Sequence, residues 1–290
     1  MAASIPVIPE SWTSAPVEGE EMDSLALWPS GERNWVVATA KQGERLFVFD
    51  ADSGTRIGTS GGPGGGPGQF RRPNGVAVAG DLLFVVERDG HRVQVLRLPD
   101  FTPLGDFGGG ELQVPYGIWV DSSTPGTLTA YVTDSFMADF AARTLPPRER
   151  LTERVKRYQV SVDASGHLQS RYPGAFGDTG EDGALRMVES IAGDPAHGRL
   201  LIAEEDRRVG STLREYSLDG RYPGRDLTAF EEDAEGVVLW PCGANGGYWI
   251  AVDQGRPDPL PRLRPHHAGP GRQLHRRTDS VDRRGSPARP

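Results

Sequence analysis

Acidic side chains at matching positions are the residues of this sequence best suited to chemistry. The chain contains similar β-rich segments, and Glu189, Glu204 and Glu235 fall at corresponding strand positions of neighbouring segments. Carboxylate oxygens are the ligands that Ca²⁺ prefers in proteins, and a bound ion can neutralise phosphates and lower the pKa of a bound water. The pattern favours a site for cations, or for phosphates that cations bridge.

Other kinds of site find less support in the residues. Cys242 is the only cysteine, which excludes an internal disulfide framework and a Cys-based zinc site. None of the six His pairs with a Ser or Cys in a way that indicates a catalytic triad. The run "GGPGGGPG" (Gly61–Gly68) lacks the Gly-Lys-Ser/Thr ending and the following helix of a phosphate-binding loop, so we interpret it as a flexible connection.

The charge of the chain is unevenly distributed. The formal net charge is −8, yet residues 255–290 contain nine Arg, three Asp and neither Lys nor Glu, so the remainder carries −14. A body this acidic is a poor nucleic-acid binder. No run approaches the roughly 20 apolar residues of a membrane helix, and the opening "MAASIPVIPE" has no signal-peptide pattern. We expect a monomer that binds neither nucleic acid nor membrane.

An internal repeat of about 40–50 residues indicates the architecture. The segment "DSLALWPSGERNWVVATAKQGERLFVFDADSGTRIG" (Asp23 to Gly58) matches "AEGVVLWPCGANGGYWIAVDQ" (Ala234 to Gln254), with Trp28 and Trp240 at equivalent positions. Each unit has a short strand, a turn and a longer strand, and the 38 Gly and 24 Pro suit many short elements. We predict an all-β fold, a β-propeller of about four to five encoded blades over residues 1–254, with both Trp packed between blades. The only helical candidate is Met137–Val155, which can equally be a loop.

Residues 255–290 differ from everything before them. The first unit continues into "RLFVFDADSGTRIG", whereas the last becomes Arg- and Pro-rich after Gln254. Removing one G from permitted codons at Gly255 lets the tail be read as "FLVFDRTTLAPVG", the missing partner of that strand. We therefore interpret residues 255–290 as a disordered basic tail produced by a frameshift, in which His266, His267 and His275 are not metal ligands. The alternative is a natural disordered tail that binds anions.

Several units resemble the β-propeller phytases. The segment "MVESIAGDPAHGRLLIAEED" is similar to a blade of that family with a Glu-Gly-type start and an "LYIAEED" strand, and "DAEGVVLWPCGANGGYWIAVDQG" is similar to the following blade. "VATAKQGERLFVFDADSG", "RPNGVAV" and "PYGIW" resemble its first, second and third blades. The resemblance runs in family order from Met22 to Gly255. It implies a six-bladed, calcium-dependent phosphatase, incomplete here, that releases phosphate from phytate or a related compound and is secreted or periplasmic.

The resemblance also implies roles for individual residues. The calcium ligands it implies are Glu189, Glu204, Glu235, Asp233 and Asp23. The substrate-binding residues it implies are Lys41, Arg88 and Tyr116. Of these eight positions, Glu204, Glu235, Lys41 and Arg88 are expected to be catalytic. This chain departs from the family pattern at Thr133-Asp134-Ser135, where the family has an Asn-Lys-like pair, and at Ser190, where it has Gly.

Two other classes of function remain open. The segment "GQFRRPNGVAV…VERDGHRVQVL" also resembles NHL-repeat propellers, which implies a non-catalytic propeller that binds a protein partner on its top face. A lactonase-type propeller hydrolase is the third possibility. It would need a convergent Glu/Asn/Asp set on one metal, which this sequence does not readily provide. Whether the truncated chain is active is a separate question.

Overall fold

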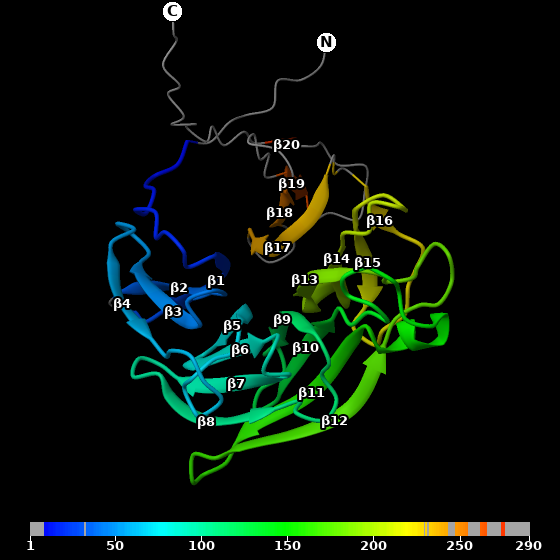
Figure 1. Ribbon diagram of the computed structural model, residues 1–290. Helices are drawn as coiled ribbons and strands as arrows, with labels where there is room; N and C mark the ends of the chain where they lie inside the picture. Colours follow the sequence, from blue (N-terminus) through cyan, green and yellow to red (C-terminus); the bar gives the residue numbers. More distant parts are fainter. Residues whose placement is uncertain are drawn as a thin grey trace, which may run out of the picture.

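Five antiparallel sheets follow one another around a common centre (Figure 1). The computed structural model describes residues 9–31, 33–228, 230, 232–242 and 247–254, and the backbone of 262–265 and 274–275. Each sheet has four strands, ordered as in the sequence. The described residues therefore form an incomplete β-propeller, which confirms the all-β prediction, and we number the sheets blades 1 to 5.

Every blade runs from an inner strand near the centre to an outer strand at the rim. Blade 1 contains β1 (Met22–Pro29), β2 (Asn34–Ala40), β3 (Arg45–Asp50) and β4 (Arg56–Ser60). Blade 2 contains β5 (Pro73–Ala79), β6 (Leu82–Glu87), β7 (Arg92–Arg97) and β8 (Thr102–Phe107). Blade 3 contains β9 (Pro115–Asp121), β10 (Leu128–Asp134), β11 (Val155–Val162) and β12 (Leu168–Phe176).

The last two blades have shorter outer strands. Blade 4 contains β13 (Val188–Asp194), β14 (Arg199–Glu204), β15 (Thr212–Ser217) and β16 (Asp226–Leu227). Blade 5 contains β17 (Asp233–Pro241), β18 (Gly247–Gln254), β19 (Arg262–Pro265) and β20 (Leu274–His275). Two short 3-10 helices, η1 (Arg148–Glu153) and η2 (Pro195–His197), lie in connections. The helical candidate Met137–Val155 is therefore mostly a connection, and only η1 within it is helical. Across the described residues, no helix is both long and apolar enough to span a membrane.

Middle strands are apolar on both faces because a blade packs on each side of them. In β6, Leu83 and Val85 join the core shared with blade 1, whereas Phe84 and Val86 join the core shared with blade 3. All four side chains are fully buried. The period of two in a β-strand thus divides one continuous apolar run between two interfaces.

The ring of blades is open between blade 5 and blade 1. The inner strands contact one another in the series β1, β5, β9, β13, β17, and in the described part of the chain β17 has no comparable contact with β1. Apolar side chains are exposed on both sides of this opening: Leu25 and Leu27 on β1 are 67% and 56% exposed, and Val238 and Trp240 on β17 are 54% and 49% exposed.

Two expectations about the end of the chain need correction. Trp28 is buried between blades as expected, but Trp240, at the equivalent position, lies at the opening and is not packed there. The tail was expected to add no strands after Gln254, yet Arg262–Pro265 pairs with β18 and with Leu274–His275. The remaining part of residues 255–290, including His266 and His267, lies outside the described residues.

Candidate functional site

A β-bulge near the start of every inner strand aims side chains at one end of the central axis. In each blade, two residues of the inner strand lie opposite one residue of the next strand. The five pairs are Asp23-Ser24, Asn74-Gly75, Tyr116-Gly117, Glu189-Ser190 and Glu235-Gly236. Bulges bend a strand and redirect its side chains. Because the bulge recurs at the same place in each blade, successive blades can each place a polar side chain near the axis.

The second residue of each pair is small, and in blades 2 and 3 it is a glycine against which the neighbouring inner strand packs closely. A Cβ atom on Gly75 would lie 2.4 Å from the carbonyl oxygen of Tyr116, and one on Gly117 would lie 2.6 Å from that of Glu189. Thr133, opposite the bulge in blade 3, accepts a hydrogen bond from the Gly117 N–H (2.8 Å) and donates one to the Glu189 carbonyl (2.6 Å). Thr39 joins blades 1 and 2 in the same way.

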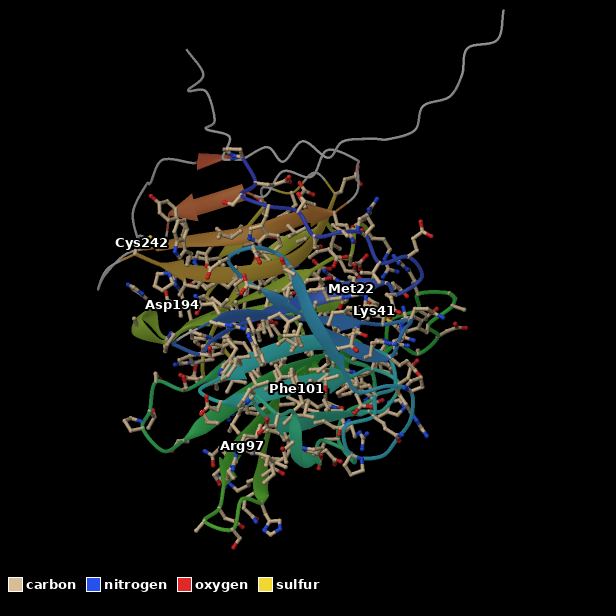
Figure 2. All side chains as sticks on the ribbon, turned by 90° about the vertical axis from the view of Figure 1, so that its left-hand side faces the viewer. Met22, Lys41, Arg97, Phe101, Asp194 and Cys242 are labelled. Atoms are coloured by element: carbon tan, nitrogen blue, oxygen red, sulfur yellow. The ribbon has the colours of Figure 1, made fainter. Side chains whose placement is uncertain are left out.

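Seven of the eight predicted site residues line one cavity of about 410 Å³ at this end of the axis. They are Asp23, Lys41, Arg88, Tyr116, Glu189, Asp233 and Glu235. Figure 2 shows Lys41 on this side of the molecule, away from Asp194 and Cys242. The structure thus brings together residues from all five blades.

Lys41 is held in the cavity wall by two other predicted residues. Its Nζ lies 2.6 Å from Oδ1 of Asp23 and 3.4 Å from the hydroxyl of Tyr116, and it sits over the Tyr116 ring at 5.1 Å from the centroid. Burial alone would lower the pKa of Lys41, but the Asp23 carboxylate outweighs it and raises the pKa overall. Burial, reinforced by Glu189, raises the pKa of Tyr116 to about 12. Lys41 is therefore a cation and Tyr116 a neutral donor at neutral pH.

Buried and half-buried carboxylates on blades 4 and 5 face the cavity and repel one another. Burial raises the pKa of Glu189 well above its usual range, and the charges of Glu205 and Glu235 raise it further. Burial, with Glu235 and Asp233, raises the pKa of Glu205 to about 7. Burial and the nearby Asp23 also raise the pKa of Glu235. This wall carries more negative charge than its own cations neutralise, which favours binding of additional positive charge.

Two predicted residues already have ionic partners at the rim. Arg88 donates to both carboxylate oxygens of Asp89, at 2.7 and 3.1 Å. Asp233 accepts two hydrogen bonds from Arg207, at 2.5 and 2.7 Å. Both Arg88 and Asp233 still line the cavity, so a ligand would compete with these partners.

Glu204 does not line the cavity and has a structural environment instead. It is fully buried, and its carboxylate accepts hydrogen bonds from the backbone N–H groups of Arg186, Met187 (2.9 Å) and Asp206 (3.0 Å). The prediction that Glu204 faces a common site with Glu189 and Glu235 is therefore wrong: Glu204 ends the second strand of its blade, and its neighbour Glu205 lines the cavity instead.

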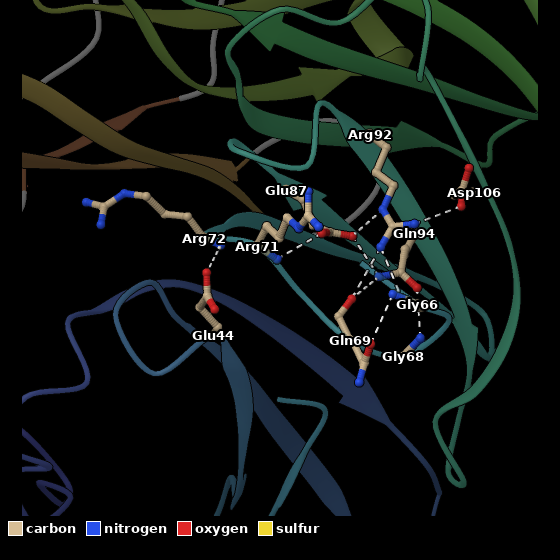
Figure 3. A network of polar contacts seen from close by, with 10 residues as sticks. All are labelled: Glu44, Gly66, Gly68, Gln69, Arg71, Arg72, Glu87, Arg92, Gln94 and Asp106. Atoms are coloured by element: carbon tan, nitrogen blue, oxygen red, sulfur yellow. Dashed lines mark hydrogen bonds and ion pairs between the residues drawn. The ribbon is translucent and has the colours of Figure 1, made fainter. Parts of the chain in front are cut away.

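The role of Glu204 recurs in other blades. A carboxylate at or next to the end of the second strand accepts backbone N–H groups just before the inner strand of its own blade. These carboxylates are Glu87, Asp134, Glu204 and Asp253. Figure 3 shows the network around Glu87, which accepts from the Arg71 N–H (2.9 Å), Arg92 Nε (2.7 Å) and Gln94 Nε2 (2.6 Å). Asp134 lies where the phytase-like pattern has an Asn-Lys-like pair. In this chain it braces the start of β9, and its Oδ2 lies 3.0 Å from the Lys156 Nζ.

The oxygen donors of the cavity suit calcium chemically, since most of them are carboxylate oxygens. Within the described ranges, however, no three His, Cys, Asp or Glu side chains converge so that they could hold an ion by themselves. The carboxylates surround the cavity and do not meet at one point. Calcium bound there would need further oxygen ligands from water or from a bound anion.

Among the cavity residues that the sequence did not predict are Glu205 and Arg143. Glu205 follows Glu204 directly, and the strand pattern alone does not show which of the two turns inward. Arg143 lies in the connection between β10 and η1, which has no counterpart in the repeat. The doubled Glu in "AEED" was a usable signal for Glu205, whereas nothing in the repeat indicated Arg143.

The raised pKa of Glu205 predicts a pH dependence of stability in metal-free protein. Its folded pKa of about 7 exceeds the ordinary value of 4.5, so its contribution to stability is fully present below pH 4.5 and is lost as the pH rises through about 7. Thermal melts in a chelator should show that Glu205→Gln gains stability relative to wild type as the pH rises from about 4.5 to about 7, and that it keeps this gain at higher pH. An equal difference at acid and alkaline pH would contradict this.

The comparisons with known proteins support the β-propeller fold and give no information on the chemistry of the cavity. Residues 70–96 match the NHL repeat, which covers most of β5 to β7. No curated protein was found to match the sequence. Hydrazine synthase from Kuenenia stuttgartiensis is similar in structure, with a TM-score of 0.53 and 13% identity over 92% of this chain and 68% of that one. A chain from a crystal structure of a nidogen/laminin complex has a TM-score of 0.50 and 15% identity over 83% and 75%. The chain is thus a β-propeller protein with an NHL-like second blade.

Proposed function

We propose that this chain is a calcium-dependent phosphomonoester hydrolase that releases phosphate from phytate or a related compound. The observation that carries the proposal is the composition of the cavity wall, where Glu189, Glu205 and Glu235 face the same space as Lys41 and Arg143. Carboxylates attract divalent cations, and the basic side chains attract the oxygens of a phosphate ester. A wall with both kinds of group suits an anionic ligand that binds together with cations.

Individual residues of the cavity can be given roles in the proposed hydrolysis. Calcium, when bound, would neutralise the phosphates and lower the pKa of a bound water. Lys41, held by Asp23 and Tyr116, presents a fixed positive charge to the ester. Tyr116 stays protonated because of its raised pKa, so its hydroxyl can donate to a phosphate oxygen. Arg88 can exchange its partner Asp89 for a second phosphate oxygen.

The test is release of inorganic phosphate from phytate by the purified chain. We expect release with about 1 mM Ca²⁺ and none in a calcium chelator. Glu205→Gln removes a negative charge from the cavity wall at nearly constant shape. It should weaken calcium binding, measured by titration calorimetry, and reduce phosphate release by about 10–100-fold.

A matched carboxylate change away from the cavity serves as the control. Asp100 is exposed in the turn between β7 and β8, at the opposite ends of the strands. Asp100→Asn should leave both calcium binding and phosphate release unchanged. If the folded wild-type chain releases no phosphate with calcium, or if Glu205→Gln behaves like Asp100→Asn, the proposal is wrong.

The NHL match favours one other function, a non-catalytic propeller that binds a protein partner at the same end of the axis. It rests on residues 70–96, which form part of blade 2 and contribute Arg88 to the cavity. A folded chain that neither binds calcium nor releases phosphate would leave this alternative in place.

A further inference from the structure

The connection after β10 forms part of the cavity wall. Residues 137–144 close into a compact turn, in which the Ala138 N–H donates to the Thr144 carbonyl and the Thr144 N–H donates to the Asp139 carbonyl, both at 2.9 Å. The Asp139 side chain also accepts the Ala142 N–H at 2.9 Å. Arg143 has a positive φ of 50°, which only a well-held turn sustains for a residue other than Gly, Asn or Asp. The loop therefore has a defined, hydrogen-bonded conformation in the cavity wall.

An aromatic side chain of this loop is displayed at the rim. Phe140 is 57% exposed although it lines the cavity, and the guanidinium of Arg88 lies over its ring at 5.9 Å from the centroid. An exposed aromatic ring beside a charged cavity offers an apolar surface to a ligand that has both charged groups and a carbon skeleton.

Arg143 differs from the other cations of the cavity in having no ionic partner in the described part of the chain. Lys41 is paired with Asp23 and Arg88 with Asp89. Among the described residues, no carboxylate oxygen lies within 4.0 Å of the Arg143 guanidinium, and its side chain is exposed. It lines the cavity near Glu205, whose charge it influences. An incoming anion therefore need not displace an ion-paired carboxylate of the described residues in order to reach Arg143.

We propose that the 137–144 loop is a recognition element, in which Arg143 binds a second anionic group of the ligand and Phe140 packs against its carbon ring. This deepens the proposed function, on which it rests, by assigning a specificity-determining residue that the blade repeat does not supply. The loop distinguishes a ring compound with several phosphates from an ester with one, because only the former can reach Arg143 while another phosphate is near Lys41.

The experiment compares two substrates and two variants. Arg143→Asn removes the charge and tolerates the positive φ, and Arg143→Lys keeps the charge. We expect Arg143→Asn to raise KM for phytate by about tenfold with kcat nearly unchanged, and to leave KM for p-nitrophenyl phosphate unaltered. Arg143→Lys should recover part of the loss. Arg97, exposed at the far end of β7 (Figure 2), supplies the control Arg97→Asn, which should change neither KM.

A binding measurement separates this inference from the proposed function. Calorimetric titration with phytate in the presence of Ca²⁺ should show weaker binding to Arg143→Asn than to Arg97→Asn, whether or not phosphate is released. Binding that depends on Arg143 without any phosphate release would support the recognition loop and contradict the hydrolase. Equal binding by the two variants, equal KM changes for both substrates, or no binding to wild type would overturn the inference.

Discussion

Replacing Glu204 by Ala should destabilise the fold more than any single change at the cavity wall. The substitution leaves three backbone N–H groups without their buried acceptor and opens a cavity beneath the start of β13. An unsatisfied buried donor costs about 1–3 kcal/mol, so we expect a loss of roughly 3–5 kcal/mol in the free energy of unfolding. A thermal melt should show a midpoint lower by roughly 10 °C.

The adjacent residue provides the matched control for that prediction. Glu205→Ala removes the same side chain one position later, but from the cavity wall, where no backbone N–H of the described residues donates to it. Its melting temperature without calcium should stay close to that of wild type or rise, while calcium binding falls. If Glu204→Ala and Glu205→Ala had the same melting temperature, the distinction between brace and cavity residue would be wrong.

Replacing Gly117 by Ala should disrupt the contact between blades 3 and 4. The new Cβ would lie 2.6 Å from the Glu189 carbonyl oxygen and 2.9 Å from the Ser190 Cα, both backbone atoms that cannot rotate away. Relief requires separation of β9 from β13, which weakens the bond from Thr133 to Glu189. Overpacking of this kind costs about 1–3 kcal/mol, and the lost inter-blade bond adds to it. Urea unfolding should show the loss as a lower midpoint.

Gly109→Ala is the control for the Gly117 variant. A Cβ on Gly109 would meet no atom within 4 Å, so the change should be nearly neutral. The Gly117 variant should also bind calcium more weakly, because Tyr116 and Glu189 flank the altered contact. A Gly117→Ala protein as stable as Gly109→Ala would mean that the inner strands are not in the close contact described.

The repeat in the sequence was sufficient to predict the blades, whereas the candidate site residues came from the resemblance of the units to a known family. In the structure Asp23, Tyr116, Glu189 and Glu235 occupy one position of the repeat, the bulge of the inner strand. The sequence pattern had instead grouped Glu204 with Glu189 and Glu235. The sequence could not show which of Glu204 and Glu205 faces the cavity, since this depends on where β14 ends and which way the next residue turns. Arg143 could not be predicted as a cavity residue, because the connection in which it lies has no periodic sequence pattern. The exposure of Trp240 depends on whether another blade follows, which no local sequence feature determines.

The open ring has a consequence for the order in which parts of this protein lose their structure. In a closed propeller every blade has two neighbours, but here blades 1 and 5 each have one among the described residues. Stability in such a linear array is a sum of nearest-neighbour interfaces, and the end units open first. Asp23 and Lys41 belong to blade 1, whereas Asp233 and Glu235 belong to blade 5. Part of the cavity wall therefore belongs to the two least protected units, so the cavity loses its shape while blades 2 to 4 remain folded.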